Sequence, residues 1–312
     1  MKTPVNSSHP LPEDREEMIS LWQTTFQDSD EFAEMFFSRA YKPENTLVIK
    51  KDGKIISALQ MIPYEIKNGD DIIPAAYVCG VCTLTFERGK GLMKILMNEA
   101  MDVMRRKGYG ISTLIPAHPW LFDIYRKYGY IYPINYYTER YLSKNNPNNS
   151  DIDKVRNNDL SCYTFKTYTG KYFPYFDKKQ RERQSAILHN SYNIENILID
   201  LTNDNGNIFV ALYENNPIGI AFASPDSEKE VAIKEILYDN TQIKEALIYH
   251  ILNFYNAEVA KVRLPKQEIP DQKINTKTLS NDSKKAYPYG LACILDKRIT
   301  DITSLYMTLM LD

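Results

Sequence analysis

The most constraining feature of this sequence is a β-rich run that passes through a glycine-containing turn into a helical pattern. The run at 72–85 is followed by Arg88-Gly89-Lys90-Gly91-Leu92-Met93, and apolar residues then recur at helical spacing to Val103. Such a junction brings unpaired backbone N–H groups and the positive end of the helix dipole to one point. Gly89 and Gly91 leave room for an anion, while Arg88 and Lys90 add positive charge. The junction therefore predicts a phosphate-binding loop.

The patterns before and after this loop predict one mixed α/β domain. Asp52-Gly53 is typical of a hairpin turn, Gly80 indicates a bulge or a close backbone approach within its strand, and Gly108 follows a basic helix end. Strand and helix periodicities place the other elements. The expected elements are two short helices within 15–40, broken at 27–30, strands at 46–51, 54–66 and 72–85, a helix at 92–107, a strand at 111–115, a helix at 119–128 and a strand at 130–142.

The second half of the chain repeats part of this order after a polar, turn-prone segment. That segment predicts a linker at 146–160 between one domain at 1–145 and another at 161–312. Hairpin, strand, helix and strand recur, which argues for a duplicated architecture. These repeated elements are expected at 208–213, 218–224, 231–238, 241–255 and 258–264, with a surface loop at 266–282 and a docked strand or short helix at 299–311.

The corresponding junction of the second half lacks the features of a phosphate loop. It reads Tyr238-Asp239-Asn240-Thr241-Gln242-Ile243, without glycine and with an acidic side chain where phosphates would lie. Asn240 or Thr241 fits a helix N-cap instead. We therefore expect the second domain to lack a cofactor site.

Charge and composition exclude several classes of function. The 38 basic and 40 acidic residues leave a formal net charge of −2, which gives no general attraction to nucleic acid or to an anionic membrane. The N-terminus lacks the apolar core of a signal peptide, and no run of about 18 apolar residues occurs. With only four cysteines in 312 residues, a reducing compartment is the simpler inference. The sequence thus predicts a cytoplasmic protein without nucleic-acid or membrane partners.

The cysteines and histidines do not predict a metal site. Cys79 and Cys82 have the spacing of a thiol pair, but they are expected in a strand, where packing is the better explanation. His9, His189 and His250 have no metal-ligand spacing. No metal cofactor is therefore expected.

Three linked motifs resemble those of a known enzyme superfamily. Residues 15–142 resemble the GNAT superfamily of N-acetyltransferases in element order, and Arg88 and Gly91 match its Arg/Gln-x-x-Gly-x-Gly/Ala signature, with Met93 as a departure. Gly80-Val81-Cys82-Thr83 and Ile124-Tyr125-Arg126-Lys127-Tyr128-Gly129-Tyr130 are similar to the Eis branch of aminoglycoside acetyltransferases. The resemblance implies a GNAT fold, an α/β fold with a mixed sheet, in two tandem domains. The sterol-carrier-like C-terminal domain of that branch is not expected here.

The resemblance also implies how acetyl-CoA would bind. The cofactor would lie between the strands at 77–85 and 111–115, and the backbone of Val81, Cys82 and Thr83 would pair with the pantetheine arm. One backbone N–H there would stabilise the oxyanion formed during transfer. The pyrophosphate would be held by Arg88, Gly89, Lys90, Gly91, Leu92 and Met93. The side chain of Met93 would have to point away from the phosphates.

Tyr125 is the residue to which the resemblance gives a catalytic role. It aligns with the tyrosine that protonates the departing CoA thiolate, and a phenol with an ordinary pKa of about 10 is protonated at neutral pH. The general base stays open among His118, Glu65 and the C-terminal carboxylate of Asp312.

The expected function is transfer of an acetyl group from acetyl-CoA to a primary amine of a small molecule or peptide, by direct attack in a ternary complex. A homo-oligomer remains open. One alternative is a non-catalytic acyl-CoA sensor or assembly module. Another is a tRNA-dependent aminoacyltransferase with tandem GNAT domains, against which the net charge of −2 and the intact loop argue.

Overall fold

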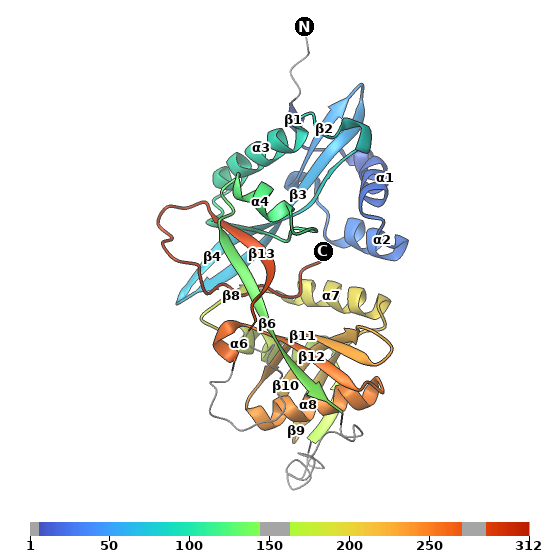
Figure 1. The fold of residues 1–312 in the computed structure, drawn as a ribbon, viewed down its shortest axis with the longest axis vertical. Helices are drawn as coiled ribbons and strands as arrows, with labels where there is room; N and C mark the ends of the chain where they lie inside the picture. Colours follow the sequence, from blue (N-terminus) through green and yellow to red (C-terminus); the bar gives the residue numbers. More distant parts are fainter. Residues whose placement is uncertain (1–5, 144–162, 270–284, 312) are drawn as a thin grey trace. The chain divides into compact units, whose positions relative to one another are not determined.

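The computed structural model describes residues 6–143, 163–269 and 285–311, which form two compact units (Figure 1). The first unit comprises Met1–Ile134, Tyr289–Leu305 and Leu311–Asp312, and the second comprises Asn135–Pro288 and Tyr306–Met310. The expected linker at 146–160 lies outside the described residues. No helix in the described ranges has the length and apolar character that a membrane span requires.

A mixed sheet forms the centre of the first unit. Its strands follow the order β1-β2-β3-β4-β5-β13, in which β4 and β5 are parallel and the other described pairs are antiparallel. Asp52 and Gly53 join β2 to β3 with φ values of 53° and 80°, which confirms the predicted hairpin. The strands are β1(Ser7–Ser8), β2(Thr46–Lys51), β3(Lys54–Asn68), β4(Asp71–Thr83), β5(Ile111–Leu114) and β13(Tyr287–Ile294).

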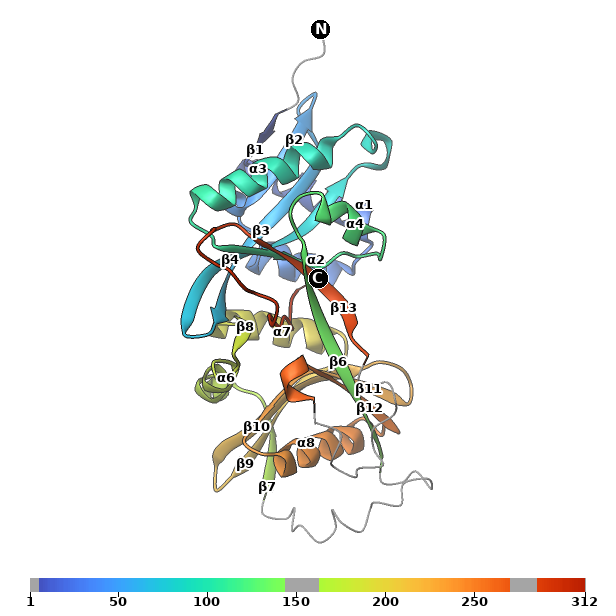
Figure 2. The same ribbon diagram turned by 60° about the vertical axis from the view of Figure 1, so that its left-hand side comes forward.

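Helices cover both faces of this sheet (Figures 1 and 2). On one face, α3(Leu92–Arg106) and α4(Leu121–Arg126) share an apolar core with alternate residues of the sheet, such as Leu59 and Met61. On the other lie α1(Arg15–Phe26) and α2(Asp30–Arg39), which are separated by the predicted break. Ser29 caps α2, since its side chain accepts a hydrogen bond from the Phe32 N–H.

The predicted bulge at Gly80 is confirmed. Ala58 pairs with Cys82 and Gln60 with Cys79, so Gly80 and Val81 together oppose one residue of β3. Gly80 has a φ of 58°, a backbone conformation that favours glycine. The pairing between β4 and β5 ends just before the bulge, at Val78 and Leu114. We call this end of the two parallel strands the first fork.

The second unit contains another mixed sheet, in the order β6-β12-β11-β10-β9-β7, with β11 and β12 parallel. The expected hairpin, strand, helix and strand are present as β9, β10, β11, α8 and β12. A core cluster packs α8 against one face, and Phe176 of α6 packs on Phe222 from the other. The strands are β6(Tyr132–Leu142), β7(Tyr163–Thr167), β8(Ser185–Leu188), β9(Asn207–Tyr213), β10(Asn216–Pro225), β11(Glu230–Tyr238) and β12(Val259–Leu264), and the helices are α6(Phe173–Gln180), α7(Ser191–Asn203) and α8(Thr241–Phe254).

The C-terminal part of the chain differs from the sequence expectation. β13 was not predicted, and its pairing with β5, including Leu291 opposite Leu114, places Tyr289–Leu305 in the first unit rather than in a domain at 161–312. Residues 299–311 form neither a helix nor a regular strand. This segment is mostly buried and has one isolated bridge, between Tyr306 and Ala186 of the second unit.

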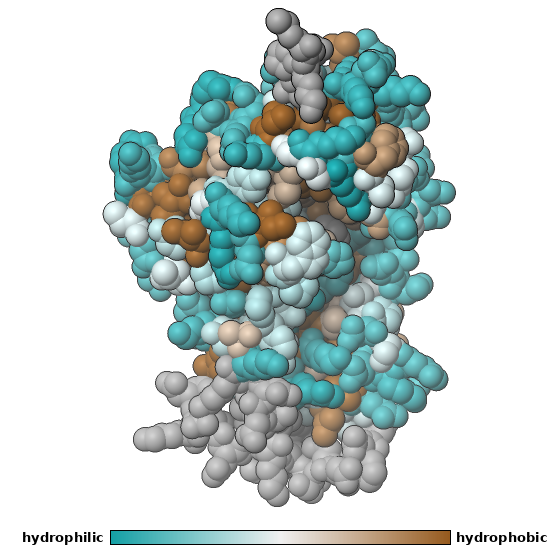
Figure 3. All heavy atoms as spheres, turned by 45° about the horizontal axis from the view of Figure 1, so that its top comes forward, coloured by the Kyte–Doolittle hydropathy of each residue, from teal (hydrophilic) through white to brown (hydrophobic). Residues whose placement is uncertain are grey.

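Short 3₁₀ turns connect several of these elements. They lie at Pro12–Asp14, Pro43–Asn45, Thr85–Glu87, Gly170–Tyr172 and Lys266–Glu268. The face drawn in Figure 3 is largely hydrophilic, with apolar side chains in small groups. Among the exposed large apolar side chains, Phe86 and Trp120 flank the loop and α4.

Candidate functional site

A cavity of about 640 Å³ lies at the first fork, where the bulge, the glycine loop and α4 meet. Eight of the nine residues predicted to bind the cofactor line it, which are Val81, Cys82, Thr83, Arg88, Gly89, Gly91, Leu92 and Met93. Tyr125 lines the same cavity. The structure therefore brings together motifs that are up to 44 positions apart in the chain (Val81 to Tyr125).

The loop presents a row of backbone donors. Gly89 and Gly91 have φ values of 76° and 81°, and a Cβ added to either would meet no atom within 4 Å, so the backbone conformation rather than crowding favours glycine. Gly91 is the N-cap of α3 and has no side-chain capping bond. Within the described residues, the N–H groups of 89–93 have no hydrogen-bond acceptor. An anion bound here would accept hydrogen bonds from several of these N–H groups and would be stabilised by the positive end of the helix dipole.

The charged side chains of the loop are arranged differently from the expectation. Lys90 is the one predicted residue that does not line the cavity: its Nζ donates to the Glu87 carboxylate at 2.8 Å and to the Phe86 carbonyl at 3.0 Å. Lys51 donates to the same carboxylate at 2.8 Å, and these two bonds lower the pKa of Glu87. The charge of Lys90 is thus balanced by a carboxylate that is only 5% exposed.

Two other basic side chains lie at the cavity wall. Arg88 donates from Nε to the Thr83 carbonyl at 3.1 Å, which ties the loop to the end of β4. Lys94 was not predicted to line the site. Its position in the first turn of α3, two residues after the helix begins at Leu92, could have indicated it. Met93 is partly buried against the core cluster under α3 and also lines the cavity.

Tyr125 is held rigidly in α4. Its ring lies edge-on to that of Tyr130, with centroids 6.2 Å apart, and Tyr130 is fixed by a 2.7 Å hydrogen bond to Ser112. The Tyr125 side chain is 6% exposed, and burial raises its pKa above the ordinary value, as do the nearby Tyr128, Cys79 and Cys82. In the described part of the chain its hydroxyl has no hydrogen-bond partner. The phenol is therefore neutral and able to donate into the cavity.

One of the two thiols beside Tyr125 is also neutral. Cys79 and Cys82 are buried and unoxidised, and burial raises the pKa of Cys82 to about 12. A thiol in this state is a poor nucleophile and metal ligand. Within the described residues, no group of three or more His, Cys, Asp or Glu side chains could hold a metal ion.

The three candidate bases lie in different places. His118 lines the cavity, and its ring stacks on Trp120 with centroids 6.2 Å apart. Glu65 is exposed on β3 and does not line the cavity. Asp312 lies outside the described residues. Thr25 and Phe26, from the last turn of α1, were not singled out from the sequence but also line the cavity.

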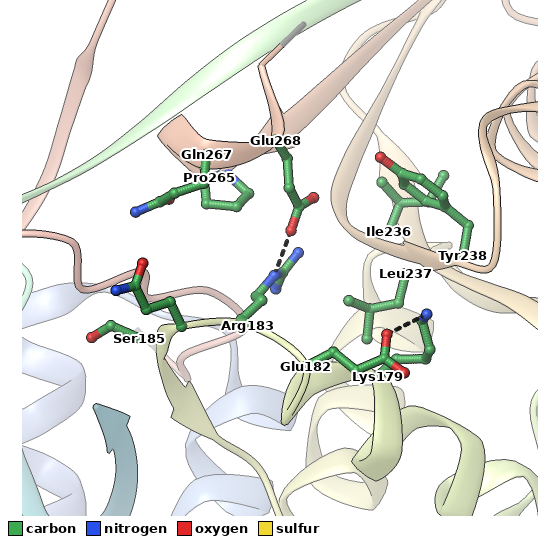
Figure 4. Close-up of a pocket in the computed structure, with 11 residues that line it drawn as sticks. Lys179, Glu182, Arg183, Ser185, Ile236, Leu237, Tyr238, Pro265, Gln267 and Glu268 are labelled. Carbon is green, nitrogen blue, oxygen red and sulfur yellow. Dashed lines mark hydrogen bonds and ion pairs between the residues drawn. The ribbon is translucent and has the colours of Figure 1, made fainter. Parts of the chain in front are cut away.

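The second unit has a fork of its own, with a smaller cavity of about 320 Å³ (Figure 4). The pairing of β11 with β12 ends at Ile233 and Val262, and a register shift against β10 makes Lys234 a bulged residue. We call this region the second fork. Its cavity is lined by Lys179, Glu182, Arg183, Gln184, Ser185, Ile236, Leu237, Tyr238, Pro265, Gln267 and Glu268.

An ion-pair group occupies the second fork. Arg183 donates to both Glu235 carboxylate oxygens at 2.6 and 2.8 Å and to Glu268 at 2.8 Å (Figure 4 shows the bond to Glu268). Glu235 also accepts from the N–H of Ile236 at 2.9 Å. The Asn240 side chain caps α8 at 3.1 Å, as predicted. At the start of α8 the N–H of Ile243 is thus satisfied by a side chain of the protein, and the N–H of Ile236 in β11 is satisfied by another.

Comparison with known proteins connects the first unit to an enzyme family. Residues 9–132 match the profile of an acetyltransferase (GNAT) domain. Over 133 residues, 38% of this chain and 74% of the relative, the sequence is 26% identical to S-alkylcysteine N-acetyltransferase of Bacillus subtilis.

Solved structures share the fold over nearly the whole chain. A probable N-acyltransferase of unknown function from Enterococcus faecalis has a TM-score of 0.71 and 16% identity, covering 94% of this chain and 73% of its own. A GCN5-related N-acetyltransferase from Kribbella flavida has a TM-score of 0.70 and 14% identity, with 93% and 71% covered. Eis1 from Mycobacterium abscessus has a TM-score of 0.64 and 11% identity, with 94% and 74% covered. At these identities the likeness concerns the fold, which is the expected mixed α/β fold.

Proposed function

We propose that this chain, whose residues 9–132 match the profile of a GNAT acetyltransferase domain, transfers the acetyl group of acetyl-CoA to a primary amine of a small molecule or peptide. One observation carries the proposal: a single cavity of about 640 Å³ is lined both by the loop with free backbone donors at 89–93 and by the neutral phenol of Tyr125. Either feature alone would support only an anion site or a buried tyrosine.

The residues of the first fork fit acetyl-CoA. The left-handed Gly89 and Gly91 leave open space beside the main chain, so the free N–H groups of the loop would hold the pyrophosphate. Arg88 and Lys94 would add positive charge, and the bulged strand at Val81, Cys82 and Thr83 would hold the pantetheine arm. When bound, the cofactor supplies an acetyl thioester that the acceptor amine attacks directly.

The side chains of the cavity supply the proton transfers. Tyr125 donates its hydroxyl proton to the departing sulfur, for which its raised pKa keeps it in the acidic form. His118 accepts the proton of the amine, because it lines the same cavity while Glu65 lies elsewhere on the sheet. The raised pKa of Cys82 keeps that thiol neutral, and direct attack by the amine needs no acyl-enzyme.

The cavity wall suggests the chemical class of the acceptor. Phe26, Trp120 and Leu121 give part of the wall an apolar character. The relative from Bacillus subtilis is an S-alkylcysteine N-acetyltransferase, which supports a small amino acid with an apolar side chain as one acceptor to test.

For the second unit we propose a GNAT-like domain of the Eis-like tandem arrangement that does not bind CoA. The occupied second fork and the capped helix α8 support this role. We also propose a cytoplasmic location, because four cysteines in 312 residues are too few for a secreted disulfide scaffold.

Thiol release and calorimetry test the proposal together. Free CoA should appear rapidly from acetyl-CoA with at least one amine in a panel of S-alkylcysteines, other amino acids, polyamines, aminoglycosides and peptides. Calorimetric titration should give one equivalent of CoA per chain. Tight CoA binding with only slow hydrolysis across the panel would favour the non-catalytic sensor. Two equivalents per chain would contradict the assignment of the second unit.

A further inference from the structure

Trp22 of α1 lies against the bulge that opens the first fork. A Cβ added to Gly80 would lie 2.4 Å from Cζ3 of Trp22 and 3.1 and 3.3 Å from two further ring atoms. The indole therefore occupies the space that any other residue at position 80 would need. The side chain of Trp22 is 5% exposed, so no mobile solvent layer separates it from the backbone of β4.

The indole is held from several sides. Its ring nitrogen donates to the Asp28 carboxylate at 2.7 Å, in the segment between α1 and α2. Phe36 stacks on the indole with centroids 4.6 Å apart, and Phe26 and Phe37 contact it at 4.8 and 5.7 Å. Aromatic packing of this kind fixes ring position as well as contributing apolar burial. The indole is thus a rigid support rather than a filler of a loose gap.

The same helix also reaches the cavity directly. Thr25 and Phe26 follow Trp22 by about one turn and line the cavity, as do Cys79, Gly80 and Val81 of the bulge. One face of α1 therefore supports the bulged backbone while the end of the helix contributes to the cavity wall. A shift of α1 would move both.

We propose that Trp22, anchored by Asp28, is a positioning residue that fixes the bulge at Gly80 and thereby aligns the thioester end of acetyl-CoA with Tyr125. The inference rests on the proposed function. Trp22 does not touch the reacting atoms. Its effect comes from the backbone that it holds, since misplacement of a reacting group by about 1 Å can lower the rate by about 10²-fold.

Paired substitutions on α1 test this role. Trp22→Phe removes the ring atoms that contact Gly80 and the bond to Asp28, and we expect kcat/KM for acetyl-CoA to fall at least about tenfold. Leu21→Ala is the matched control, because Leu21 is equally buried on the same helix but is not among the atoms nearest Gly80. It should lower the melting temperature at least as much while kcat/KM stays within about twofold. Equal effects of the two variants would overturn the proposal.

Asp28→Ala provides a second variant should Trp22→Phe fail to fold. It removes only the acceptor of the indole N–H, and kcat/KM should still fall at least about threefold with little change in melting temperature; an unchanged value would overturn the proposal.

A double-mutant cycle separates this inference from the proposed function. Gly80→Ala should destabilise the wild-type protein more than it destabilises Trp22→Phe, because the second background lacks the clashing ring atoms. Absence of this coupling in urea unfolding would refute the contact even if the protein bound no CoA. A wild-type protein that binds no CoA in calorimetry would instead refute the proposed function alone.

Discussion

Tyr125 and Tyr130 are two buried phenols on the same short segment, with different surroundings. The Tyr130 hydroxyl is 2.7 Å from Ser112 in the core, while that of Tyr125 has no partner in the described residues and belongs to the cavity wall. Burial raises the pKa of both. The difference in hydrogen bonding, rather than in acidity, distinguishes the proposed catalytic group from a packing group.

Tyr125→Phe should lower kcat about 10²-fold or more with a good acceptor, because the departing sulfur loses its proton donor. Calorimetric affinity for CoA should change little. Tyr130→Phe is the matched control: it removes one hydroxyl from the core and costs about 1 kcal/mol of unfolding free energy, with turnover nearly unchanged. Turnover of Tyr125→Phe equal to that of Tyr130→Phe would exclude the acid role.

For single residues, the sequence predicted the positions where the backbone conformation itself requires a particular residue type, such as glycine at a positive φ. Gly80, Gly89 and Gly91 were singled out, and all three have positive φ. Lys90 and Trp22 could not be placed in this way. The ion pair of Lys90 with Glu87 is local, but Glu87 also pairs with Lys51 from a distant strand. The contact of Trp22 with Gly80 likewise depends on packing between distant segments.

The two forks are the element-scale feature that most separates the units. Both contain parallel strands whose pairing ends beside a bulge, followed by a helix. In the first fork, the N-cap residue of the helix is Gly91, which has no side chain to cap it. In the second fork, the side chain of Asn240 caps the helix, and Arg183 forms ion pairs with Glu235 and Glu268. The same backbone arrangement is therefore open in one unit and filled by side chains in the other.

Arg183→Ala should lower the free energy of unfolding by about 3–5 kcal/mol, because it leaves the buried Glu235 without its partner. Arg181→Ala is the control two residues away. Its partner Asp177 is partly exposed, so the expected loss is below about 1 kcal/mol. Urea unfolding of both variants measures the difference. Similar losses would show that the group at the second fork is not a significant source of stability.

Local patterns predicted the elements that follow one another closely and missed those that depend on distant partners. The helices, hairpins and strands of residues 15–142 and 207–264 were largely predicted, with end shifts of a few residues. The helix α7 was missed, although Asn190 and Asn193 form a capping box before it. β13 had no local signal of comparable strength, because its place is set by pairing with β5 about 180 residues earlier.

For the molecule as a whole, a buried histidine predicts that the free energy of unfolding decreases in mild acid. His189 is 2% exposed, its Nε2 lies 3.0 Å from the Thr308 carbonyl oxygen, and burial lowers its pKa from 6.5 to about 4. In the unfolded chain His189 therefore binds a proton below about pH 6.5, whereas in the folded chain it binds one only below about pH 4. The stabilisation is complete above pH 6.5 and decreases as the pH falls, by about 3 kcal/mol in total.

Urea unfolding between pH 7.5 and 5.0 measures this effect. Burial raises the pKa of Glu235 and Glu245, so the comparison with a His189 variant is needed to separate their contribution. His189→Leu should start from a lower stability, having lost the contact with Thr308, and should show a shallower decline. His250, whose pKa burial also lowers, retains a part of the pH dependence in that variant. A decline as steep as that of the wild-type protein would show that His189 is not its source.

The pairing of β13 with β5 has a consequence for the order of events during synthesis. β5 leaves the ribosome with an unpaired edge, and the residues that cover it, Leu291–Ile294, follow about 180 positions later. At roughly 5–20 residues per second, this edge stays uncovered for roughly 10–40 s. The first unit of the protein is thus begun first and completed only near the end of synthesis, with its sheet edge open to other nascent chains throughout that interval.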